Sequence, residues 1–548
     1  MNQRSQAIAL VSAALLVAGT TIAYAKAPTL SGFFPSGAAR GQSLTATMSG
    51  TFEHWPVKCW TDGAGLSIEA GGEKGKLAIC VAADAEPGVR WVRVYDEEGA
   101  TSLRPFIVGT LPEIVESEPN DDPQHPQSIG LASSTVNGRL SPSGDVDGYS
   151  VSLDRGQKLV ADLEASRHLG SPMDAVLQVV SAAGFVLAQN DDAVGRDPRI
   201  IFEAPAPGTY IVRLFAFPST PDSRIRFAGG DAFIYRLTLT TGGFVDHVFP
   251  LAVSQDSPTS LTAIGPNILE RDRALTICTN EERDVFTLFH PRLPGNTNVR
   301  RVTGNSVVEV EPNDLAQPQE LSDRDSISGR IDPPGERDVF RINLKKGEKH
   351  FFSLESRALG LPLDAVLQVL DADGKMLAET DDVGKSRDPE LSFTPPADGK
   401  YRVVVSDLNG RGGPHFAYLL RVLVPEPDFN LSLSADRFEL GSGKKTDIVV
   451  KIDRSNGFTD TIDVVAEDLC KCVVATTARS RQSDATAKSV TLEIRAEACS
   501  NAGPIKIIGR SADGKSRLRI ARAQIPGFEA KTDRPWLTIL PVAEPKKP

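Results

Sequence analysis

The chain has 548 residues, which is enough for several domains of ordinary size. Its 40% hydrophobic and 24% charged residues exclude a mostly disordered chain, and its 46 Gly and 38 Pro fall far short of a collagen or linker composition. A formal net charge of −11 argues against nucleic acid as a partner, because binding it normally needs a basic face.

Residues 1–25 have the three parts of a secretory signal peptide. Arg4 gives the positive start, residues 7–18 the apolar stretch, and Ala23-Tyr24-Ala25 the cleavage site. The alternative is a membrane anchor, but the apolar stretch is short for a span of about 20 residues. We therefore expect cleavage, no membrane span in the mature chain, and a secreted or periplasmic protein of a bacterium.

Six cysteines in an exported chain can form disulfides. Cys59 and Cys80 lie in one N-terminal segment and are a candidate pair. Near the C-terminus, Cys499 is expected to bond either Cys470 or Cys472. If the latter two share a strand, they point to one face and cannot easily bond each other. Cys278 has no obvious partner, and buried free thiols are the alternative for the whole set.

Two short segments share a pattern, and each precedes one copy of a larger repeat. Phe34-Pro35 leads to Gly41 and Gly50, and Phe249-Pro250 leads to Gly265-Pro266-Asn267. Residues 26–109 therefore predict a small Ig-like sandwich, and residues 242–305 a reduced relative of it.

The larger repeat is carried by several matches in constant order. Glu118-Pro119-Asn120-Asp121 recurs as Glu311-Pro312-Asn313-Asp314, and Gly138-Arg139-Leu140 recurs as Gly329-Arg330-Ile331. The stretch 169–179 recurs as 359–369 with nearly the same residues. Chance does not keep so many matches in register, so we infer two copies of one domain, at 114–241 and 306–424.

Each copy is expected to be all-β. Short apolar or alternating runs, such as 176–180 and 210–214, are separated by Gly, Pro, Asn and Asp, and no helical periodicity is sustained. Residues 428–525 alternate strongly and predict a C-terminal Ig-like domain, followed by a tail at 526–548. The predicted fold class is multi-domain all-β, with two jelly-roll sandwiches alternating with Ig-like domains.

At the two large repeats the sequence resembles the bacterial pre-peptidase C-terminal (PPC) domain family. The resembling residues are the Glu-Pro-Asn-Asp starts, the segments 144–149 and 335–340, and the closing Gly208-Thr209-Tyr210 and Gly399-Lys400-Tyr401. The resemblance implies non-catalytic jelly rolls that flank secreted peptidases or occur in modular exported proteins. The small domains before them are similar to Ig/IPT-type modules.

The PPC family includes the collagen-binding domains of clostridial collagenases, which bind calcium through an E-x-E-x-N-D segment and downstream acidic residues. Both copies here keep that segment, at 116–121 and 309–314. Glu336 stands where the first copy has an aspartate, so the geometry of the second site is expected to differ.

The types and spacing of these residues also indicate a calcium site. In an extended segment, residues two apart face the same side, and calcium takes six to eight oxygen ligands. A turn at Pro-Asn-Asp would bring in the following aspartate, and two acidic residues downstream would supply the opposite wall. A solvated acidic turn is the alternative. The expected Ca²⁺ ligands are Glu116, Glu118, Asn120, Asp121, Asp145 and Asp147 in the first copy and Glu309, Glu311, Asn313, Asp314, Glu336 and Asp338 in the second.

Motifs of known catalytic sites are absent from the sequence: it has no H-E-x-x-H pair, no G-x-S-x-G elbow and no P-loop. We therefore expect a non-catalytic exported protein, with calcium-stabilised domains that bind an extracellular protein or polysaccharide, as in adhesion. One alternative is a scaffold or accessory subunit of a secreted hydrolase encoded elsewhere. Another is a hydrolase with an unrecognised carboxylate pair, since two carboxylates can meet from distant positions.

Overall fold

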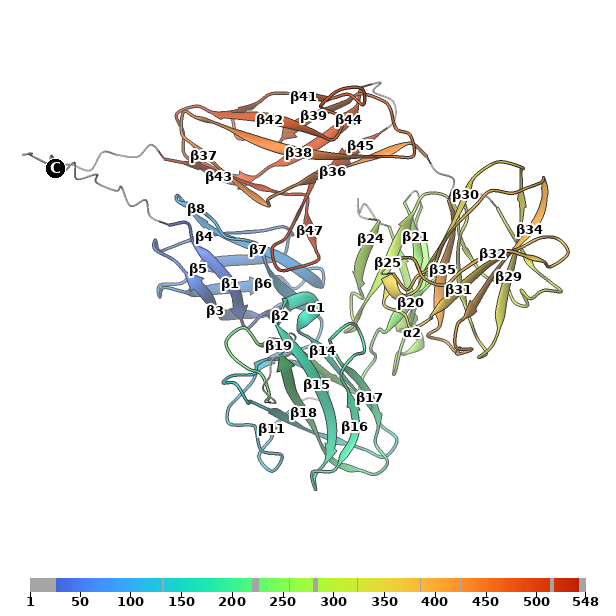
Figure 1. Ribbon diagram of the computed structural model, residues 1–548. Coiled ribbons are helices and arrows are strands. Elements are labelled where there is room, and N and C mark those ends of the chain that lie inside the picture. Colours follow the sequence, from blue (N-terminus) through green and yellow to red (C-terminus); the bar gives the residue numbers. More distant parts are fainter. Residues whose placement is uncertain are drawn as a thin grey trace, which may run out of the picture.

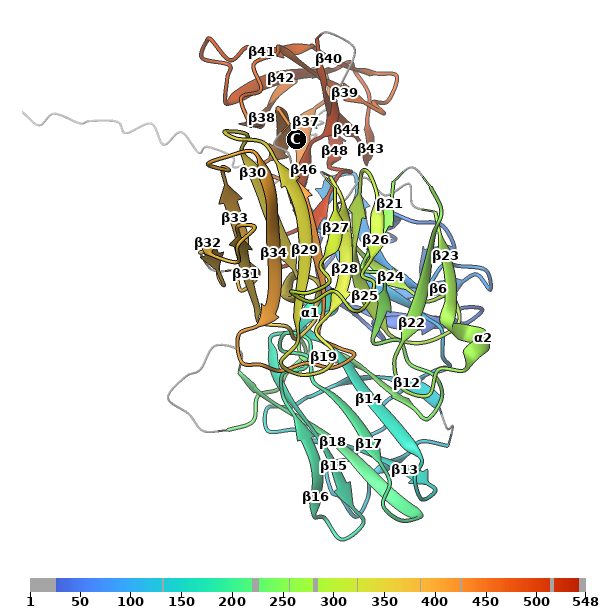
Figure 2. The same ribbon diagram turned by 90° about the vertical axis from the view of Figure 1, so that its right-hand side faces the viewer.

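The structure is a computed structural model that describes residues 26–130, 133–218, 226–255, 257–278, 284–322, 324–384, 386–423, 426–512 and 517–541. It is built almost wholly from β-strands, which form five packed units (Figures 1 and 2). The all-β, multi-sandwich fold predicted from the sequence is therefore confirmed. The signal peptide expected at 1–25 lies outside the described residues. No helix in the described part of the chain is long and apolar enough to cross a membrane.

The first unit, blue in Figure 1, packs sheet β1-β3-β6-β5 against sheet β2-β9-β7-β4, with β8 added at β7. Burial alternates along β6, so that Leu77, Ile79 and Val81 face the core. Its strands are β1 (Thr29–Phe34), β2 (Gly37–Ala39), β3 (Ser43–Thr51), β4 (Lys58–Thr61), β5 (Leu66–Ala70), β6 (Lys76–Val81), β7 (Gly88–Asp96), β8 (Gly99–Ala100) and β9 (Arg104–Gly109).

The second unit is the first copy of the large repeat. Two five-stranded sheets, β10-β12-β19-β14-β17 and β11-β13-β18-β15-β16, enclose one apolar core. Its elements are β10 (Glu113–Val115), β11 (Gln127–Ser128), β12 (Ser133–Arg139), β13 (Asp147–Leu153), β14 (Lys158–Glu164), α1 (Ser166–Leu169), β15 (Met173–Ser181), β16 (Val186–Asn190), β17 (Arg199–Glu203), β18 (Gly208–Pro218) and β19 (Ile234–Thr240).

The third unit is small, with two three-stranded sheets of order β20-β22-β23 and β21-β25-β24. Its core, which includes Val248, Leu261 and Val299, is correspondingly small. Its elements are β20 (His247–Phe249), β21 (Ala252–Ser254), β22 (Thr259–Ile264), α2 (Glu270–Arg273), β23 (Ala274–Ile277), β24 (Val285–Phe289) and β25 (Asn296–Val302).

The fourth unit is the second copy of the large repeat, and its strand order reproduces the first. The sheets are β26-β28-β35-β30-β33 and β27-β29-β34-β31-β32, so the duplicated sequence folds into a duplicated topology. Its elements are β26 (Ser306–Val308), β27 (Gln319–Leu321), β28 (Ser326–Arg330), β29 (Arg337–Leu344), β30 (His350–Glu355), η1 (Arg357–Leu359), β31 (Ala365–Leu370), β32 (Met376–Thr380), β33 (Glu390–Phe393), β34 (Gly399–Asp407) and β35 (Ala417–Leu423).

The fifth unit, red in Figure 1, has sheets β40-β42-β38-β36-β46-β47, β37-β48-β43 and β41-β39-β44-β45. Its strands are β36 (Asp428–Leu433), β37 (Arg437–Gly441), β38 (Lys445–Ser455), β39 (Ile462–Glu467), β40 (Val473–Ala475), β41 (Ala478–Ser480), β42 (Ser489–Ala496), β43 (Asn501–Pro504), β44 (Lys506–Ser511), β45 (Leu518–Ile520), β46 (Arg522–Gln524), β47 (Lys531–Thr532) and β48 (Trp536–Leu540).

The expectation of a tail from residue 526 onward is wrong for residues 526–541. The short apolar run Trp536–Leu540 forms β48, which lies between β37 and β43, and Trp536 is 1% exposed. Burial of this run makes the strand part of the fifth unit's core.

The first and third units each dock on the large copy that follows them through the same pair of repeated residues. The Arg139 guanidinium lies 5.0 Å from the ring centroid of Phe34, and that of Arg330 lies 4.3 Å from that of Phe249. Such cation–π contacts stabilise an interface when partly desolvated. The repeated Phe-Pro and Gly-Arg motifs therefore belong to one interface, which the chain builds twice.

The fifth unit folds back onto the first, as both ribbon views show (Figures 1 and 2). Arg93 of β7 donates to Asp436 at 2.8 Å, and both side chains are almost fully buried. Trp536 packs edge-on against Trp60 with centroids 5.8 Å apart, and Phe528 packs against Trp91 at 5.0 Å. Chain ends that are far apart in sequence thus form one buried interface.

The disulfide expected between Cys59 and Cys80 does not form. Cys59 lies on β4 and packs against the core, whereas Cys80 lies on β6 of the other sheet and points to solvent. Alternation along the strand turns Cys80 away from the core. At the C-terminus, Cys472 bonds Cys499, one of the two pairings that the sequence left open.

Candidate metal centres

The first acidic cluster lies where the segment after β10 meets the start of β13. One carboxylate oxygen from each of Glu116, Glu118 and Asp147 lies within 4.8 Å of the others, and the same holds for Glu118, Asp121 and Asp145. Glu118 is common to both groups, so all five predicted carboxylates of this copy lie together.

Backbone contacts position the cluster. The amide of Arg139 donates to Glu116 at 2.6 Å, and the amide of Gly148 donates to the carbonyl of Asn120 at 3.1 Å. The acidic segment is therefore fixed to β12 on one side and to β13 on the other.

A glycine opposite a tyrosine makes room for the first glutamate. Gly138 on β12 pairs with Tyr235 on β19, and a Cβ at Gly138 would lie 2.2 Å from the tyrosine ring and 2.6 Å from Glu116 Oε2. The second copy repeats this with Gly329, Tyr418 and Glu309, at 2.4 and 2.5 Å. The recurrent Gly-Arg motif thus has a steric reason.

Several oxygens of the first cluster are buried without a donor. Asp147 is 0% exposed; its Oδ2 accepts from Tyr235, but no N–H or hydroxyl group of the described residues donates to its Oδ1. The side-chain oxygen and nitrogen of Asn120, also 0% exposed, have no hydrogen-bond partner in the part of the chain that the structure describes. Buried polar atoms without partners cost about 1–3 kcal/mol each, so a ligand for them is expected.

Burial and mutual repulsion make these carboxylates resist ionisation. Burial raises the pKa of Asp147 to about 9, against the hydrogen bond from Tyr235, and nearby Glu116 and Asp145 raise it further. Burial likewise raises the pKa of Glu116 to about 7 and that of Asp145 above its usual range. A cation in their midst would reverse this effect by favouring the charged forms.

The second cluster holds fewer of its predicted members. Oxygens of Glu309, Glu311 and Asp338 lie within 4.8 Å of one another. Glu309 Oε2 and Asp338 Oδ1 are buried without a hydrogen-bond partner among the described residues, and burial raises the pKa of both groups. Asn313 is 1% exposed, and its side-chain nitrogen has no hydrogen-bond partner within the described part of the chain.

Asp314 and Glu336 are not in this second group. Asp314 Oδ1 accepts from the amides of Ala316 and Gln317, the turn role that Asp122 plays through Gln124 in the first copy. In the second copy Leu315 directly follows Asp314, so one aspartate stands where the first copy has the pair Asp121-Asp122. Glu336 instead accepts from the amide of Asp332 at 2.7 Å.

Sequence reasoning missed the two tyrosines. Tyr235 and Tyr418 are fully buried and donate to Asp147 and Asp338, respectively, so each fixes one oxygen of an aspartate. Their only sequence signal is a Tyr-x-Leu triplet near the end of each copy. In the first copy Tyr149 also contacts the Tyr235 hydroxyl, whereas Phe340 in the second copy cannot.

The donor set fits calcium better than softer metals. Each cluster offers carboxylate and amide oxygens, the ligands that Ca²⁺ prefers, and none of its members is a Cys or His. The first copy brings together five carboxylates and the second brings together three. Asn120 and Asn313 are buried beside them, with their backbone amides donating to Glu118 and Glu311, respectively. The orphaned oxygens of Asp147 and Asp338 are the clearest candidates for direct ligation.

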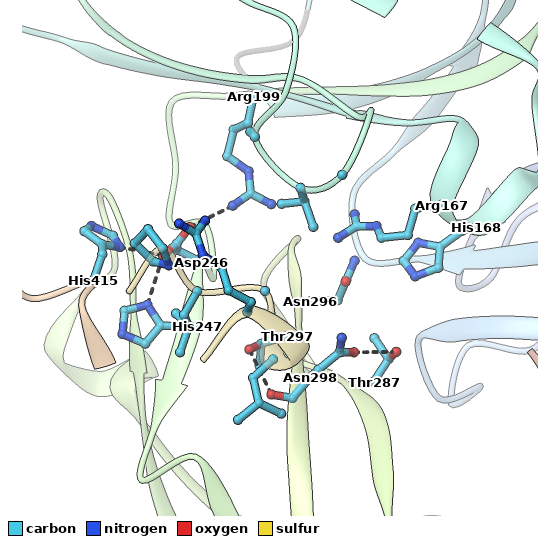
Figure 3. Close-up of a pocket in the computed structure, with 18 of the residues that line it drawn as sticks. Arg167, His168, Arg199, Asp246, His247, Thr287, Asn296, Thr297, Asn298 and His415 are labelled. Carbon is cyan, nitrogen blue, oxygen red and sulfur yellow. Dashed lines mark hydrogen bonds and ion pairs between the residues drawn. The ribbon is translucent and has the colours of Figure 1, made fainter. Parts of the chain in front are cut away.

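A separate cavity of about 640 Å³ lies at the junction of the second, third and fourth units (Figure 3). Its wall includes Arg167 from α1 and Arg357 from η1, which are equivalent positions of the two large copies. Asn298 and Thr287, hydrogen-bonded to each other, line it from the third unit. The cavity thus presents charged and amide groups from three units to one space.

Asp246 links the units around this cavity. Its carboxylate accepts from Arg199 at 2.7 Å, His247 at 2.9 Å and His415 at 2.8 Å, and Figure 3 shows it between these three side chains. These contacts hold the pKa of Asp246 well below its usual range, despite burial, and the hydrogen bond to Asp246 raises the pKa of His415. We read this cluster as an inter-unit ion-pair hub, because each carboxylate oxygen already has a cationic or imidazole partner.

Comparison with known proteins supports the duplicated domain. The family model described as bacterial pre-peptidase C-terminal domain matches residues 145–216 and 336–407. A stretch of 123 residues is 32% identical to a probable subtilase-type serine protease of Deinococcus radiodurans, covering 22% of this chain but only 16% of that protein. The chain therefore spans a small part of this relative.

Two solved structures are similar to parts of the chain. One is the pre-peptidase C-terminal domain of a collagenase from Bacillus anthracis, with 16% identity, 19% of this chain and 93% of that chain covered, and a TM-score of 0.16. The other is PliG of Aeromonas hydrophila, a periplasmic inhibitor of g-type lysozyme, with 14% identity, 23% and 97% coverage, and a TM-score of 0.16. The family match and the duplicated topology agree with the resemblance seen in the sequence, and this chain contains two bacterial pre-peptidase C-terminal domains.

Proposed function

We propose that this protein is a non-catalytic, exported binding protein whose two PPC domains are each stabilised by a calcium ion. The calcium proposal rests on one arrangement that recurs in both copies. A buried aspartate accepts a tyrosine hydrogen bond at one carboxylate oxygen, while its other oxygen has no donor among the described residues and the carboxylate lies beside two glutamates. A solvated acidic turn would leave such oxygens open to water. Repulsion among the carboxylates is relieved only by a proton or by a cation.

Calcium would act mainly on stability. An ion that binds only the folded state stabilises it by about 2.7 kcal/mol at a hundredfold excess over its Kd. The test is the melting temperature of the full chain after chelation, then with added Ca²⁺ or Mg²⁺. We expect chelation to lower it and Ca²⁺ to restore it more than Mg²⁺, because Mg²⁺ demands a stricter octahedral geometry. A melting curve that is indifferent to all three treatments contradicts the proposal.

The binding role rests on the assembly of the chain as a whole. Five β-units pack around shared interfaces, and the cavity between the two PPC copies is lined by arginine and amide side chains. We propose an extracellular polymer, protein or polysaccharide, as the partner. Retention of the purified chain on insoluble polysaccharides and fibrous proteins tests this, and no retention on any of them contradicts it. Turnover of a glycan or peptide substrate would overturn the non-catalytic assignment.

A second candidate is an accessory subunit of a separate secreted hydrolase. It is favoured by the stretch shared with the subtilase-type protease, since that stretch is 16% of a longer protein named as a protease. The two candidates separate in a pull-down from the exported fraction. A hydrolase captured at one-to-one stoichiometry supports the accessory role, whereas capture of polymer alone supports the binding role.

A further inference from the structure

Three of the six cysteines meet in the fifth unit, at a distance from both acidic clusters. Cys472 is bonded to Cys499, with their Cα atoms 6.5 Å apart. The free thiol of Cys470 lies with its Sγ 3.3 Å from the Sγ of Cys472. The sulfur atom of a thiol thus touches a sulfur atom of a disulfide.

The local backbone explains why these sulfurs converge. Cys470 and Cys472 precede β40 in a turn, closed by the amide of Val473 donating to the carbonyl of Cys470 at 2.9 Å. The strand geometry that would keep two such cysteines from bonding is therefore absent at this place. Cys499 is brought near by the amide of Glu497, which donates to the carbonyl of Cys472 at 2.9 Å.

The free thiol is also reachable. Cys470 is half-buried and lines a cavity of about 450 Å³, together with Leu469, Pro504 and Ile505. The ion pair of Arg534 with Asp468, at 2.7 Å, forms part of the same wall. A small reagent can therefore approach Cys470 without unfolding the unit.

We propose that Cys470, Cys472 and Cys499 form a thiol–disulfide exchange site. The Cys470 thiol loses its proton to solvent, and the thiolate attacks Cys472 Sγ. The Cys470–Cys472 bond forms while the Cys472–Cys499 bond breaks, and Cys499 leaves as a thiolate that takes up a proton. Numbers of thiols and disulfides are unchanged, so the step needs no oxidant or reductant.

Exchange would change which segments are cross-linked. The present bond ties the turn before β40 to the segment that leads into β43, whereas the exchanged bond is local to the turn. Because β43 pairs with β48, which carries Trp536 into the interface with the first unit, release of Cys499 would loosen an edge of the sheet that closes the molecule. The thiol exposed in that form would then react with disulfides or thiol reagents from outside.

Alkylation followed by peptide mapping of the full chain tests the proposal directly. The native protein is incubated between pH 6 and 9, treated with iodoacetamide to block free thiols and digested with trypsin without reduction. Cleavage after Lys471 separates the peptides of Cys470 and Cys472, so the two bonds give different linked peptides. We expect both forms: Cys472–Cys499 with alkylated Cys470, and Cys470–Cys472 with alkylated Cys499. The rate of Cys499 labelling should rise with pH, because the thiolate is the attacking species.

Two sets of cysteine substitutions serve as controls. Cys470→Ser should leave only the Cys472–Cys499 bond, with Cys499 unlabelled at every pH. A chain with Cys59, Cys80 and Cys278 all changed to Ser should exchange as the unmodified chain does, at a rate independent of protein concentration. Full labelling of Cys470 with Cys499 never labelled, or a bond between Cys470 and Cys499, would overturn the proposal.

Discussion

At the residue scale, the two PPC copies each hold a carboxylate in surroundings that oppose its charge. The pKa of Asp147 is raised from 3.8 to about 9, so without metal the folded state keeps a proton that the unfolded state releases. The free energy of unfolding of the metal-free protein should therefore fall as pH rises through this window. Thermal melts in chelator from pH 5 to 9 should show a steadily decreasing melting temperature. Saturating calcium should flatten this decrease, because the ion takes the place of the proton.

The substitution Asp147→Asn tests the effect of the Asp147 charge on stability and on calcium binding. Asp147→Asn keeps the shape and removes the charge, so at pH 8 the metal-free variant should melt at or above the temperature of the unmodified chain. Its gain in melting temperature on adding calcium should shrink, leaving only the contribution of the second copy. Asp122→Asn is the matched control: Asp122 is an exposed turn residue outside the clusters, and its change should leave the calcium response intact. An undiminished response in Asp147→Asn would exclude Asp147 as a ligand.

At the scale of elements, the fit between β12 and β19 decides where Glu116 can lie. A methyl group at Gly138 would collide with the Tyr235 ring, and overpacking of this kind costs about 1–3 kcal/mol. Gly138→Ala should therefore lower both the stability and the calcium response. Gly208→Ala, at a β18 position where no described residue lies within 4 Å of a new Cβ, should change neither beyond a few tenths of a kcal/mol. Equal effects of the two substitutions would refute the steric role of Gly138.

The strands and the duplicated sandwich are the features of the fold that the sequence predicts best. Alternating runs such as 210–214 fall in β18, and the doubled motifs predicted two copies of one sandwich, because a period of two and a repeat are local properties. The E-x-E-x-N-D spacing placed Glu116 and Glu118 together for the same reason. Tyr235 and Tyr418 were missed because their role depends on strand pairing, which sequence spacing does not give. The Cys59–Cys80 bond does not form because Cys80 takes an outward position on β6, whereas Cys59 packs against the core between the sheets.

At the scale of the whole molecule, closure of the fifth unit onto the first depends on a buried charge pair. Removing one partner leaves the other charge buried alone, which costs about 3–5 kcal/mol. Asp436→Ala should therefore leave Arg93, whose side chain is 0% exposed, without its ion-pair partner, and the interface should open. Small-angle scattering should report a larger radius of gyration and calorimetry a lower melting temperature. Asp453→Ala, an exposed aspartate on β38 of the same unit, should leave both unchanged. An unaltered radius for Asp436→Ala would show that the aromatic contacts suffice for closure.

The most direct measurement of the central claim is calorimetric titration of the chelator-treated full chain with calcium, alongside the Asp147→Asn/Asp338→Asn double variant. The account predicts two ions bound per chain, with protons released on binding because Asp147 and Asp338 must give up theirs. The double variant should bind neither ion. No saturable binding to the unmodified chain, or equal binding to both proteins, would contradict the account.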